Sequence, residues 1–374
     1  MKKILFLVNH DMMIYNFRIE LVEKLLEEGY EVHISSPYGE RIKELIKLGT
    51  IYHQTEINRH GINPVEERKL FRFYLTLMRS IQPDMVLSFT IKPNIYGGMV
   101  SKKLDIPFFA TITGLGTAIE QRGIKRKILL FLYKVGLQKA RMVFFQNQEN
   151  QKMMLRNHIG NQHMLLPGSG VNIKQHAYEE YPCESEVLIF TTVGRIMKEK
   201  GIYELLEAAR IIKKKYPKII FRLIGFFDDN CKAQVKKAVL EGIVEYMGEQ
   251  RWVHPFIKES YAIIHPSYHE GMSNVLLEAA ATGRPIIASD IPGCQEIFEE
   301  GISGLGFRPK DVGDLVQAIE TFIHIPYKEK IKMGKAARIK IEKEFDRKIV
   351  VRAYMEQISK VEEKKKCTQN YIKS

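Results

Sequence analysis

Residues 261–290 read YAIIHPSYHEGMSNVLLEAAATGRPIIASD. The apolar run that ends near His265 predicts a buried strand, the periodic apolar pattern over 274–282 predicts a helix, and RPIIASD predicts another strand. Two strands joined by a crossover helix form a parallel pair, and strands of a parallel sheet are apolar on both faces. This stretch therefore predicts a parallel sheet with helices packed against it.

The same alternation of strands and helices recurs along the chain. The pattern weakens over 168–186, which we interpret as a linker, and then restarts. The predicted buried strands are 2–8, 30–37, 84–90, 106–114, 142–148, 187–193, 219–225, 261–267 and 284–290. A chain of 374 residues is long enough for two domains. We expect an α/β fold with two doubly wound domains, over 1–170 and 187–345. Residues 346–374 are predicted to form a C-terminal helix that packs back towards the N-terminal domain and ends in a frayed lysine-rich tail.

The composition is that of a soluble globular protein, with 45% hydrophobic and 27% charged residues. The four cysteines are scattered without CxxC or Cys/His spacing, which favours reduced thiols in the cytosol. The first apolar run ends at Asn9 and is too short for a signal peptide. No run reaches the roughly 18 apolar residues of a membrane span. We therefore expect a cytoplasmic protein.

The net charge of +13 is unevenly distributed. Residues 60–160 hold sixteen Lys/Arg and six Asp/Glu, a local excess of +10. Within this region, 66–79 and 123–141 interleave basic with apolar residues, as helices on an anionic membrane surface do. Taken alone, either stretch fits a core helix with solvated lysines better. No nucleic-acid-binding motif is present, so nucleic acid is not an expected partner, and the residues alone leave the membrane surface open.

The loops that follow strands are where an open α/β sheet binds ligands. The first is GRIMKEKG, 194–201, in which Gly194 permits a turn and Arg195 and Lys200 suit a diphosphate. Cations are unfavourable near a helix N-terminus, so their presence there calls for a reason. The alternative is that these are ordinary surface residues.

The second loop is HEGMSN, which leads into the helix over 274–282. Ser273 or Asn274 is the predicted N-cap, and the backbone N–H groups of 271–273 would form an anion site. Glu270 in the loop and Glu278 in the second turn could contact different parts of one ligand, with Glu278 accepting two ribose hydroxyl protons. From the residues alone, glutamates that stabilise the helix N-terminus or lie on the surface are equally possible.

Together these loops resemble the family 4 retaining glycosyltransferases with the GT-B fold. The resemblance rests on an E-x7-E pair at Glu270 and Glu278, an Arg/Lys pair at Arg195 and Lys200, and the strand 283–289. The N-terminal half resembles the branch that builds capsules and lipid-linked oligosaccharides, through MIYNFR (13–18), IKPNIYG (91–97), TGLG (113–116) and PGSGVN (167–172). The resemblance implies two Rossmann-like domains that face each other across a cleft.

The resemblance also implies roles for single residues. Arg195 and Lys200 would bind the donor diphosphate and stabilise the departing nucleotide, Glu278 would hold the ribose, and Glu270 would contact the donor sugar. The catalytic set is thus Arg195, Lys200 and Glu270. The remaining expected donor-binding residues are Gly194, Gly271, Met272, Ser273, Asn274, Glu278, Asn16, Thr113 and Gly114. The expected acceptor-binding residues are Lys92 and Asn94.

The chain departs from the family at two places. NHDMMIYN replaces a glycine-rich turn after the first strand, so Asn16 would take that position, and Thr113 stands where relatives carry an acid/base residue. The second departure fits a front-side retaining mechanism, in which the leaving phosphate accepts the acceptor's proton. No DxD motif is present, and we interpret Asp228-Asp229 as loop polarity. Catalysis without a metal ion or cofactor is therefore expected.

The sequence predicts a glycosyltransferase that moves a sugar from a UDP-sugar to a lipid-diphosphate-linked saccharide. An N-acetylhexosamine is one candidate for that sugar. The enzyme would work in surface polysaccharide or glycan assembly, as a peripheral protein on the inner face of the cell membrane. The alternatives are a nucleotide-sugar epimerase of the same fold and a non-catalytic carbohydrate- or membrane-binding protein. A dehydrogenase is disfavoured because no G-x-G-x-x-G follows the first strand.

Overall fold

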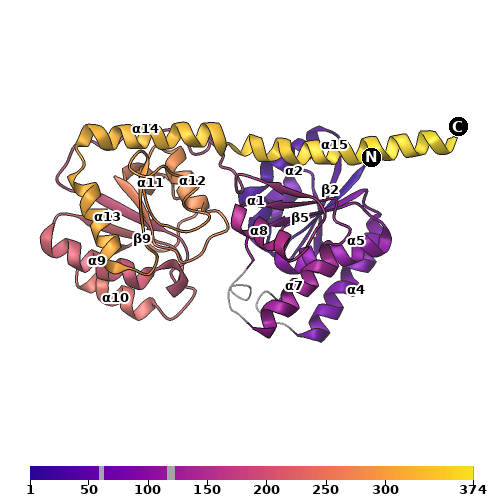
Figure 1. Ribbon diagram of the computed structural model, residues 1–374, viewed down its shortest axis with the longest axis horizontal. Helices are drawn as coiled ribbons and strands as arrows, with labels where there is room; N and C mark the ends of the chain where they lie inside the picture. The colour runs from indigo at the N-terminus through magenta and orange to yellow at the C-terminus, as the bar shows by residue number, and fades with distance from the viewer. Residues whose placement is uncertain (59–62, 116–122, 374) are drawn as a thin grey trace. The chain divides into compact units, whose positions relative to one another are not determined.

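A computed structural model describes residues 1–58, 63–115 and 123–373, with side chains described as far as residue 363. The chain forms two compact units (Figure 1). The first contains residues 1–169 and 348–374, and the second contains residues 170–347.

The first unit is built on a parallel sheet with the strand order β3-β2-β1-β4-β5-β6-β7. Its strands are β1 (Lys3–Leu7), β2 (Glu31–Ser36), β3 (Ile51–Gln54), β4 (Met85–Ser88), β5 (Phe108–Ile112), β6 (Met142–Phe145) and β7 (His163–Leu165). Its helices are α1 (Asp11–Phe17), α2 (Ile19–Glu27), α3 (Ile42–Lys47), α4 (Pro64–Ile81), η1 (Pro93–Gly97), α5 (Gly98–Leu104), α7 (Ile124–Leu137), α8 (Gln148–Arg156) and most of α15 (Arg347–Lys373).

Alternate side chains of β1 enter two separate cores. Ile4 and Phe6 pack with residues of α2, α3 and α15, whereas Leu5 and Leu7 pack with residues of α4, α5 and α7. The sheet therefore has a buried layer of helices on each face, as a parallel sheet requires. Tyr354 of α15 is fully buried, and its ring centroid lies 4.4 Å from that of Phe144 in β6.

The second unit repeats this architecture with the strand order β10-β9-β8-β11-β12-β13, again all parallel. Its strands are β8 (Ile189–Val193), β9 (Ile220–Ile224), β10 (Glu245–Tyr246), β11 (Ala262–His265), β12 (Ile286–Ser289) and β13 (Gly304–Phe307). Its helices are η2 (Lys198–Lys200), α9 (Ile202–Lys215), α10 (Lys232–Leu240), α11 (His254–Glu259), α12 (Asn274–Ala281), α13 (Val312–His324) and α14 (Tyr327–Glu344).

The strand order of the second sheet reverses between β8 and β11. β8 pairs with β9 on one side and with β11 on the other. At such a reversal the two following loops leave in opposite directions, so a crevice opens at the carboxyl ends of these strands. The loops that leave β8 and β11 here are those over 194–201 and 266–273.

The structure corrects several expectations about the elements. The strands β3, β7, β10 and β13, which sequence patterns missed, are all edge strands. The stretch NHDMMIYN contains all but the last residue of α1. The N-cap of this helix is His10, whose ring nitrogen accepts a hydrogen bond from the N–H of Met12 at 3.1 Å. The helix α15 continues to Lys373 through the tail that was expected to fray.

The expected linker is an integral part of the second unit. Arg284 is fully buried and donates hydrogen bonds to the carbonyl oxygens of Glu179 (3.0 Å), Glu180 (2.7 Å) and Lys258 (2.8 Å). The hydroxyl of Tyr181 donates to the carbonyl of Tyr261 at 2.7 Å. These bonds fasten the segment to the sheet although it lacks a regular element of its own.

Replacing Arg284 by alanine should therefore destabilise the second unit. We expect a loss of about 3 kcal/mol or more in the free energy of unfolding, because several buried carbonyls lose their donor. Urea unfolding followed by the fluorescence of Trp252, the single tryptophan, reports on this unit. Arg308→Ala is the matched control, since the Arg308 side chain is 73% exposed. Equal shifts in the two variants would contradict the role given to Arg284.

Candidate functional site

The loop after β8 is tied by its backbone to both neighbouring strand ends. Towards β9, the N–H of Ile196 donates to the carbonyl of Phe226 at 2.8 Å. Towards β11, Gly201 has a φ of +68°, and a Cβ there would lie 2.0 Å from the carbonyl oxygen of Pro266. A side chain at position 201 would push the loops apart, so a glycine is needed where they meet.

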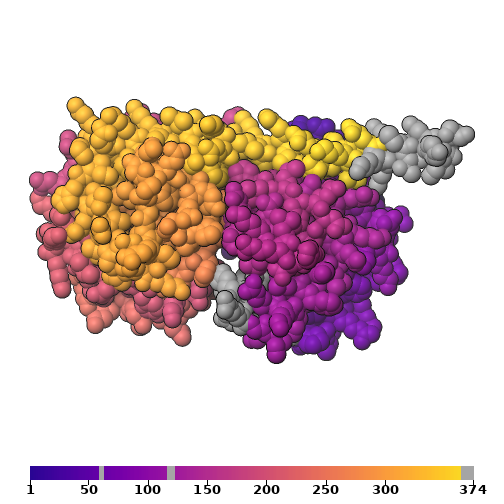
Figure 2. All heavy atoms as spheres, viewed as in Figure 1, coloured from indigo at the N-terminus to yellow at the C-terminus, as the bar shows by residue number. Residues whose placement is uncertain are grey.

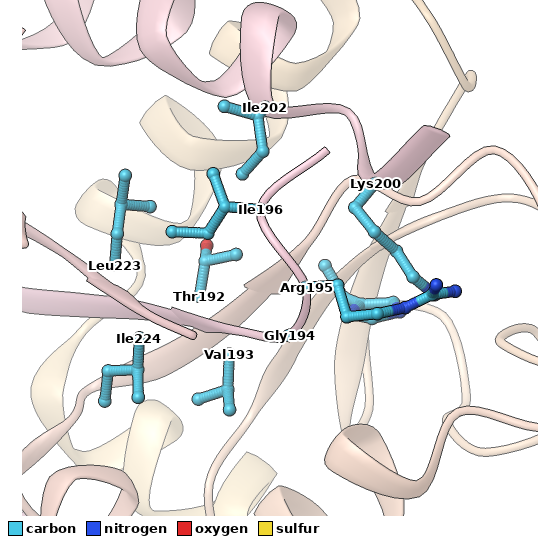
Figure 3. Close-up of a pocket in the computed structure, with 10 residues that line it drawn as sticks. Thr192, Val193, Gly194, Arg195, Ile196, Lys200, Ile202, Leu223 and Ile224 are labelled. Atoms are coloured by element: carbon cyan, nitrogen blue, oxygen red, sulfur yellow. The ribbon is translucent and has the colours of Figure 1, made fainter. Parts of the chain in front are cut away.

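Arg195 and Lys200 project from this loop and line one narrow pocket. Figure 3 shows both side chains pointing to the same side of the loop, with apolar residues from the ends of β8 and β9 on its other side. His265, the last residue of β11, lines the same pocket. The structure thus brings together the two cations that the sequence predicted to act on one ligand.

A buried network joins Lys200 to the second predicted loop. Lys200 Nζ forms an ion pair with Glu270 Oε1, and the same oxygen lies 2.8 Å from His265 Nε2. Burial alone would raise the pKa of Glu270, but the hydrogen bond from His265 and the charge of Lys200 hold this pKa well below its usual range. Glu270 is therefore a carboxylate at every physiological pH.

The predicted N-cap is confirmed at Ser273, whose hydroxyl oxygen accepts from the N–H of Leu276 at 3.4 Å. The backbone N–H of Ser273 itself donates to the carbonyl of Gly293 at 2.9 Å, so this group, which we expected to bind an anion, is already used. Asn274 Oδ1 is buried and has no hydrogen-bond partner among the described residues. A ligand hydroxyl or amide could satisfy such an acceptor in the first turn of α12.

Glu278 lies one turn further along α12 and is half-buried. Burial raises its pKa to about 7, against the opposing charge of Arg347. The two glutamates thus lie in opposite electrostatic environments. Glu270 is paired with Lys200 and hydrogen-bonded to His265, whereas the charge of Glu278 is costly and hydroxyl donors from a ligand would stabilise it.

Arg195 is more exposed than Lys200 and contacts a different acid. Its Nη1 lies 2.6 Å from Asp228 Oδ2 in the loop after β9. The neighbouring Asp229 accepts hydrogen bonds from the backbone N–H groups of Lys198 (2.6 Å) and Cys231 (2.8 Å). Asp228 and Asp229, which we interpreted as loop polarity, therefore brace the β8 loop.

Five other predicted residues, Asn16, Lys92, Asn94, Thr113 and Gly114, lie in the first unit. Asn16 is exposed on α1, Gly114 is half-buried after β5, and Thr113 Oγ1 donates to the carbonyl of Phe89 at 3.1 Å. Lys92 forms an ion pair with Glu67 at 2.5 Å.

Asn94 is wrongly placed for the acceptor contact that we expected. It is 1% exposed, its amide donates to the carbonyl of Thr111 at 2.9 Å, and its oxygen accepts from Ser88. Its polar atoms are thus used inside the unit.

His265 is the main site residue that sequence reasoning missed. It is 5% exposed, and its Nε2 also lies 3.2 Å from Ser273 Oγ, so it connects the loop carboxylate with the helix cap. A polar residue at the end of an otherwise apolar strand was the signal that could have indicated it. No group of three or more His, Cys, Asp or Glu side chains suited to a metal ion occurs in the described part of the chain.

Comparisons with known proteins match both units to glycosyltransferases. The family described as "Glycosyl transferases group 1" matches residues 177–340, and "Glycosyl transferase 4-like" matches residues 3–147. The N,N'-diacetylbacillosaminyl-diphospho-undecaprenol alpha-1,3-N-acetylgalactosaminyltransferase of Campylobacter jejuni is 27% identical over 95% of this chain and 98% of its own. The capsular polysaccharide biosynthesis glycosyltransferase CapM of Staphylococcus aureus is 22% identical over 88% and 90%.

Solved structures show the same fold. A glycosyltransferase from Rickettsia africae has a TM-score of 0.80 at 19% identity, covering 96% of this chain and 98% of its own. Anabaena Alr3699/HepE in complex with UDP has a TM-score of 0.79 at 16% identity, covering 96% and 100%. The predicted α/β class and GT-B fold are confirmed by these similarities.

The raised pKa of Glu278 predicts how stability depends on pH. The folded chain binds this proton more tightly than the unfolded chain, so the stabilisation is complete below about pH 4.5 and is lost as the pH rises through about 7. Relative to Glu278→Gln, the wild type should lose on the order of 2 kcal/mol between pH 5 and 8. Urea unfolding of both proteins, followed through Trp252, measures this difference. Glu207→Gln, which removes an exposed charge, is the control. The prediction is contradicted if the pH dependence of the unfolding free energy survives in Glu278→Gln and disappears in Glu207→Gln.

Proposed function

Because the chain belongs to the group 1 glycosyltransferases, we propose that it transfers a sugar from a UDP-sugar to a lipid-diphosphate-linked saccharide. The transfer retains the anomeric configuration and needs no metal ion. The observation that carries the proposal is the meeting of Arg195, Lys200 and Glu270 at the strand reversal of the second sheet. A non-catalytic binding protein has no need for two cations in one pocket with a charged carboxylate paired to one of them.

The donor half of the proposal rests on the chemistry of these groups. Arg195 offers a forked set of donors and Lys200 a point charge, which together suit the oxygens of a diphosphate. Glu278 accepts hydrogen bonds from the ribose hydroxyls, which would offset the cost of its buried charge. Glu270 accepts from donor-sugar hydroxyls, and Asn274 Oδ1 is free to do the same. The related fold of the Anabaena protein, crystallised with UDP, supports this choice of nucleotide.

The acceptor half rests on the relatives. The Campylobacter jejuni relative is named for a diphospho-undecaprenol-linked substrate, and the Staphylococcus aureus relative is named for capsular polysaccharide. We extend this acceptor class to the present chain. An N-acetylhexosamine donor is the corresponding first candidate. Lys92 remains the proposed contact for the acceptor phosphate.

In the proposed reaction, the bond between the anomeric carbon and the β-phosphate oxygen breaks. The acceptor oxygen forms its bond to that carbon on the same face, and its proton passes to the leaving phosphate. Arg195 and Lys200 stabilise the negative charge that develops on this phosphate, which is the largest contribution the protein can make here. Glu270 cannot act as a proton donor, since its low pKa keeps it ionised. Its role is to orient the sugar and Lys200.

We further propose that α7 places the protein on the inner face of the cell membrane. Ile124, Ile128 and Phe131 form one stripe on this helix and are 76%, 48% and 64% exposed. Lys127 and Lys134 are exposed beside them, so apolar and basic groups share one face. Figure 2 shows α7 at the surface of the first unit. Such a face suits a bilayer that contains anionic lipids. No helix in the described residues is long and apolar enough to cross a membrane.

Substituting Lys200 by alanine should lower kcat/KM for sugar transfer by at least about 100-fold, because a preorganised cation at the leaving phosphate is lost. UDP release is measured with a panel of UDP-sugars, a lipid-diphosphate-linked saccharide and EDTA, and NMR of the product reports the anomeric configuration. Lys198→Ala, an exposed lysine in the same loop, is the matched control. The function is refuted if no donor yields acceptor-dependent UDP release. Sugar interconversion without acceptor would indicate an epimerase instead.

The double variant Ile128→Ser/Phe131→Ser should bind at least about fivefold more weakly to vesicles containing phosphatidylglycerol, because two exposed apolar groups no longer enter the bilayer. Co-sedimentation at low and high salt measures the binding. The control is Val239→Ser/Leu240→Ser, a second exposed apolar pair, on α10. If both doubles bind as the wild type does, α7 is not the membrane contact.

A further inference from the structure

Both cations proposed to hold the donor diphosphate are paired with carboxylates of the chain itself. Lys200 is paired with Glu270, and Arg195 with Asp228. A diphosphate can use these cations fully only if its oxygens replace the carboxylate oxygens. The two pairs differ in how readily this exchange can occur.

The Lys200–Glu270 pair is enclosed, with side chains 20% and 13% exposed, and His265 is a second partner of the Glu270 carboxylate. The Arg195–Asp228 pair is open, with side chains 48% and 38% exposed. The carboxylate of Asp228 can therefore turn into solvent without losing its hydration. Asp228 is the acid that a diphosphate could displace at low cost.

The backbone keeps Asp228 within reach of Arg195. The N–H of Asp228 donates to the carbonyl of Ile196 at 3.2 Å, and Ile196 donates back to the carbonyl of Phe226 at 2.8 Å. Close packing of the same two loops appears at Gly225, where a Cβ would lie 1.8 Å from the carbonyl oxygen of Gly194. Asp228 is therefore held next to Arg195 by the fold, so forming this ion pair costs no further backbone entropy. An ion pair between two flexible surface residues would cost such entropy.

We propose that Asp228 competes with the donor diphosphate for Arg195 and thereby limits how tightly the nucleotide is held. This inference rests on the proposed donor site. Its consequence is a site that binds a UDP-sugar moderately and releases UDP readily, because Asp228 recaptures Arg195 as the product leaves. If Asp228 instead oriented Arg195 towards the phosphate, its loss would weaken binding. The sign of the effect decides between them.

The test measures the binding of UDP, inorganic pyrophosphate and uridine to the full chain by isothermal titration. Asp228→Asn should tighten the binding of UDP and of pyrophosphate by about two- to fivefold, which is the effect of freeing one cation from an exposed ion pair. Uridine, which lacks phosphate, should bind unchanged. The gain should shrink as salt rises, because exposed charges are screened. The rate of UDP dissociation should fall by a similar factor.

Two further variants assign the effect. When Asp228→Asn is introduced into Arg195→Ala, it should no longer tighten the binding of UDP, because the guanidinium for which Asp228 competes is absent. Glu186→Gln removes an exposed acid that pairs with Lys218 and controls for net charge; it should change nothing. The proposed competition is overturned if Asp228→Asn weakens UDP binding or leaves it unchanged. It is also overturned if uridine binding tightens equally, or if the gain in UDP affinity persists in the Arg195→Ala background. If UDP does not bind the wild type, or binds Lys200→Ala equally well, the proposed assignment of the donor site is wrong.

Discussion

The candidate site depends on the position of β8 in its sheet, between β9 and β11. Backbone pairing runs from Ile189–Ile220 to Val193–Ile224 on one side and joins Phe190 with Ala262 on the other. Because the pairing is parallel, the strands end at the same edge and deliver three loops there. The loop after β8 brings the cations, the loop after β9 brings Asp228, and the loop after β11 brings Glu270. No one of these segments is close to another in the sequence.

Burial then separates the two glutamates that the sequence presents as a pair. Glu270 has His265 and Lys200 as partners, and its pKa falls. Burial of Glu278 outweighs the opposing charge of Arg347, and its pKa rises to about 7. A carboxylate with fixed partners can orient groups, and one without them can gain from a ligand's hydroxyls. The division of one donor between sugar and ribose thus agrees with the electrostatics of the free protein.

The central strands, the α/β class and the loops at their carboxyl ends were predictable, because buried parallel strands read as apolar runs and functional loops follow them. The four edge strands were not. Three of them, β3, β7 and β10, are short and only partly covered, and β13 is buried but contains Gly304 and Gly306. The segment fastened by Arg284 has no periodic pattern, so it was taken for a linker. Partnerships such as Arg195 with Asp228 and His265 with Glu270 depend on which strands are neighbours, and local spacing does not contain that information.

The central claim is that the strand reversal of the second sheet holds the nucleotide diphosphate. A crystal structure of the full chain with UDP tests it most directly. The diphosphate oxygens should lie about 3 Å from the side chains of Arg195 and Lys200, with the ribose hydroxyls at Glu278. Asp228 should then no longer contact Arg195. UDP bound away from the loops over 194–201 and 266–273, with both ion pairs intact, would contradict the claim.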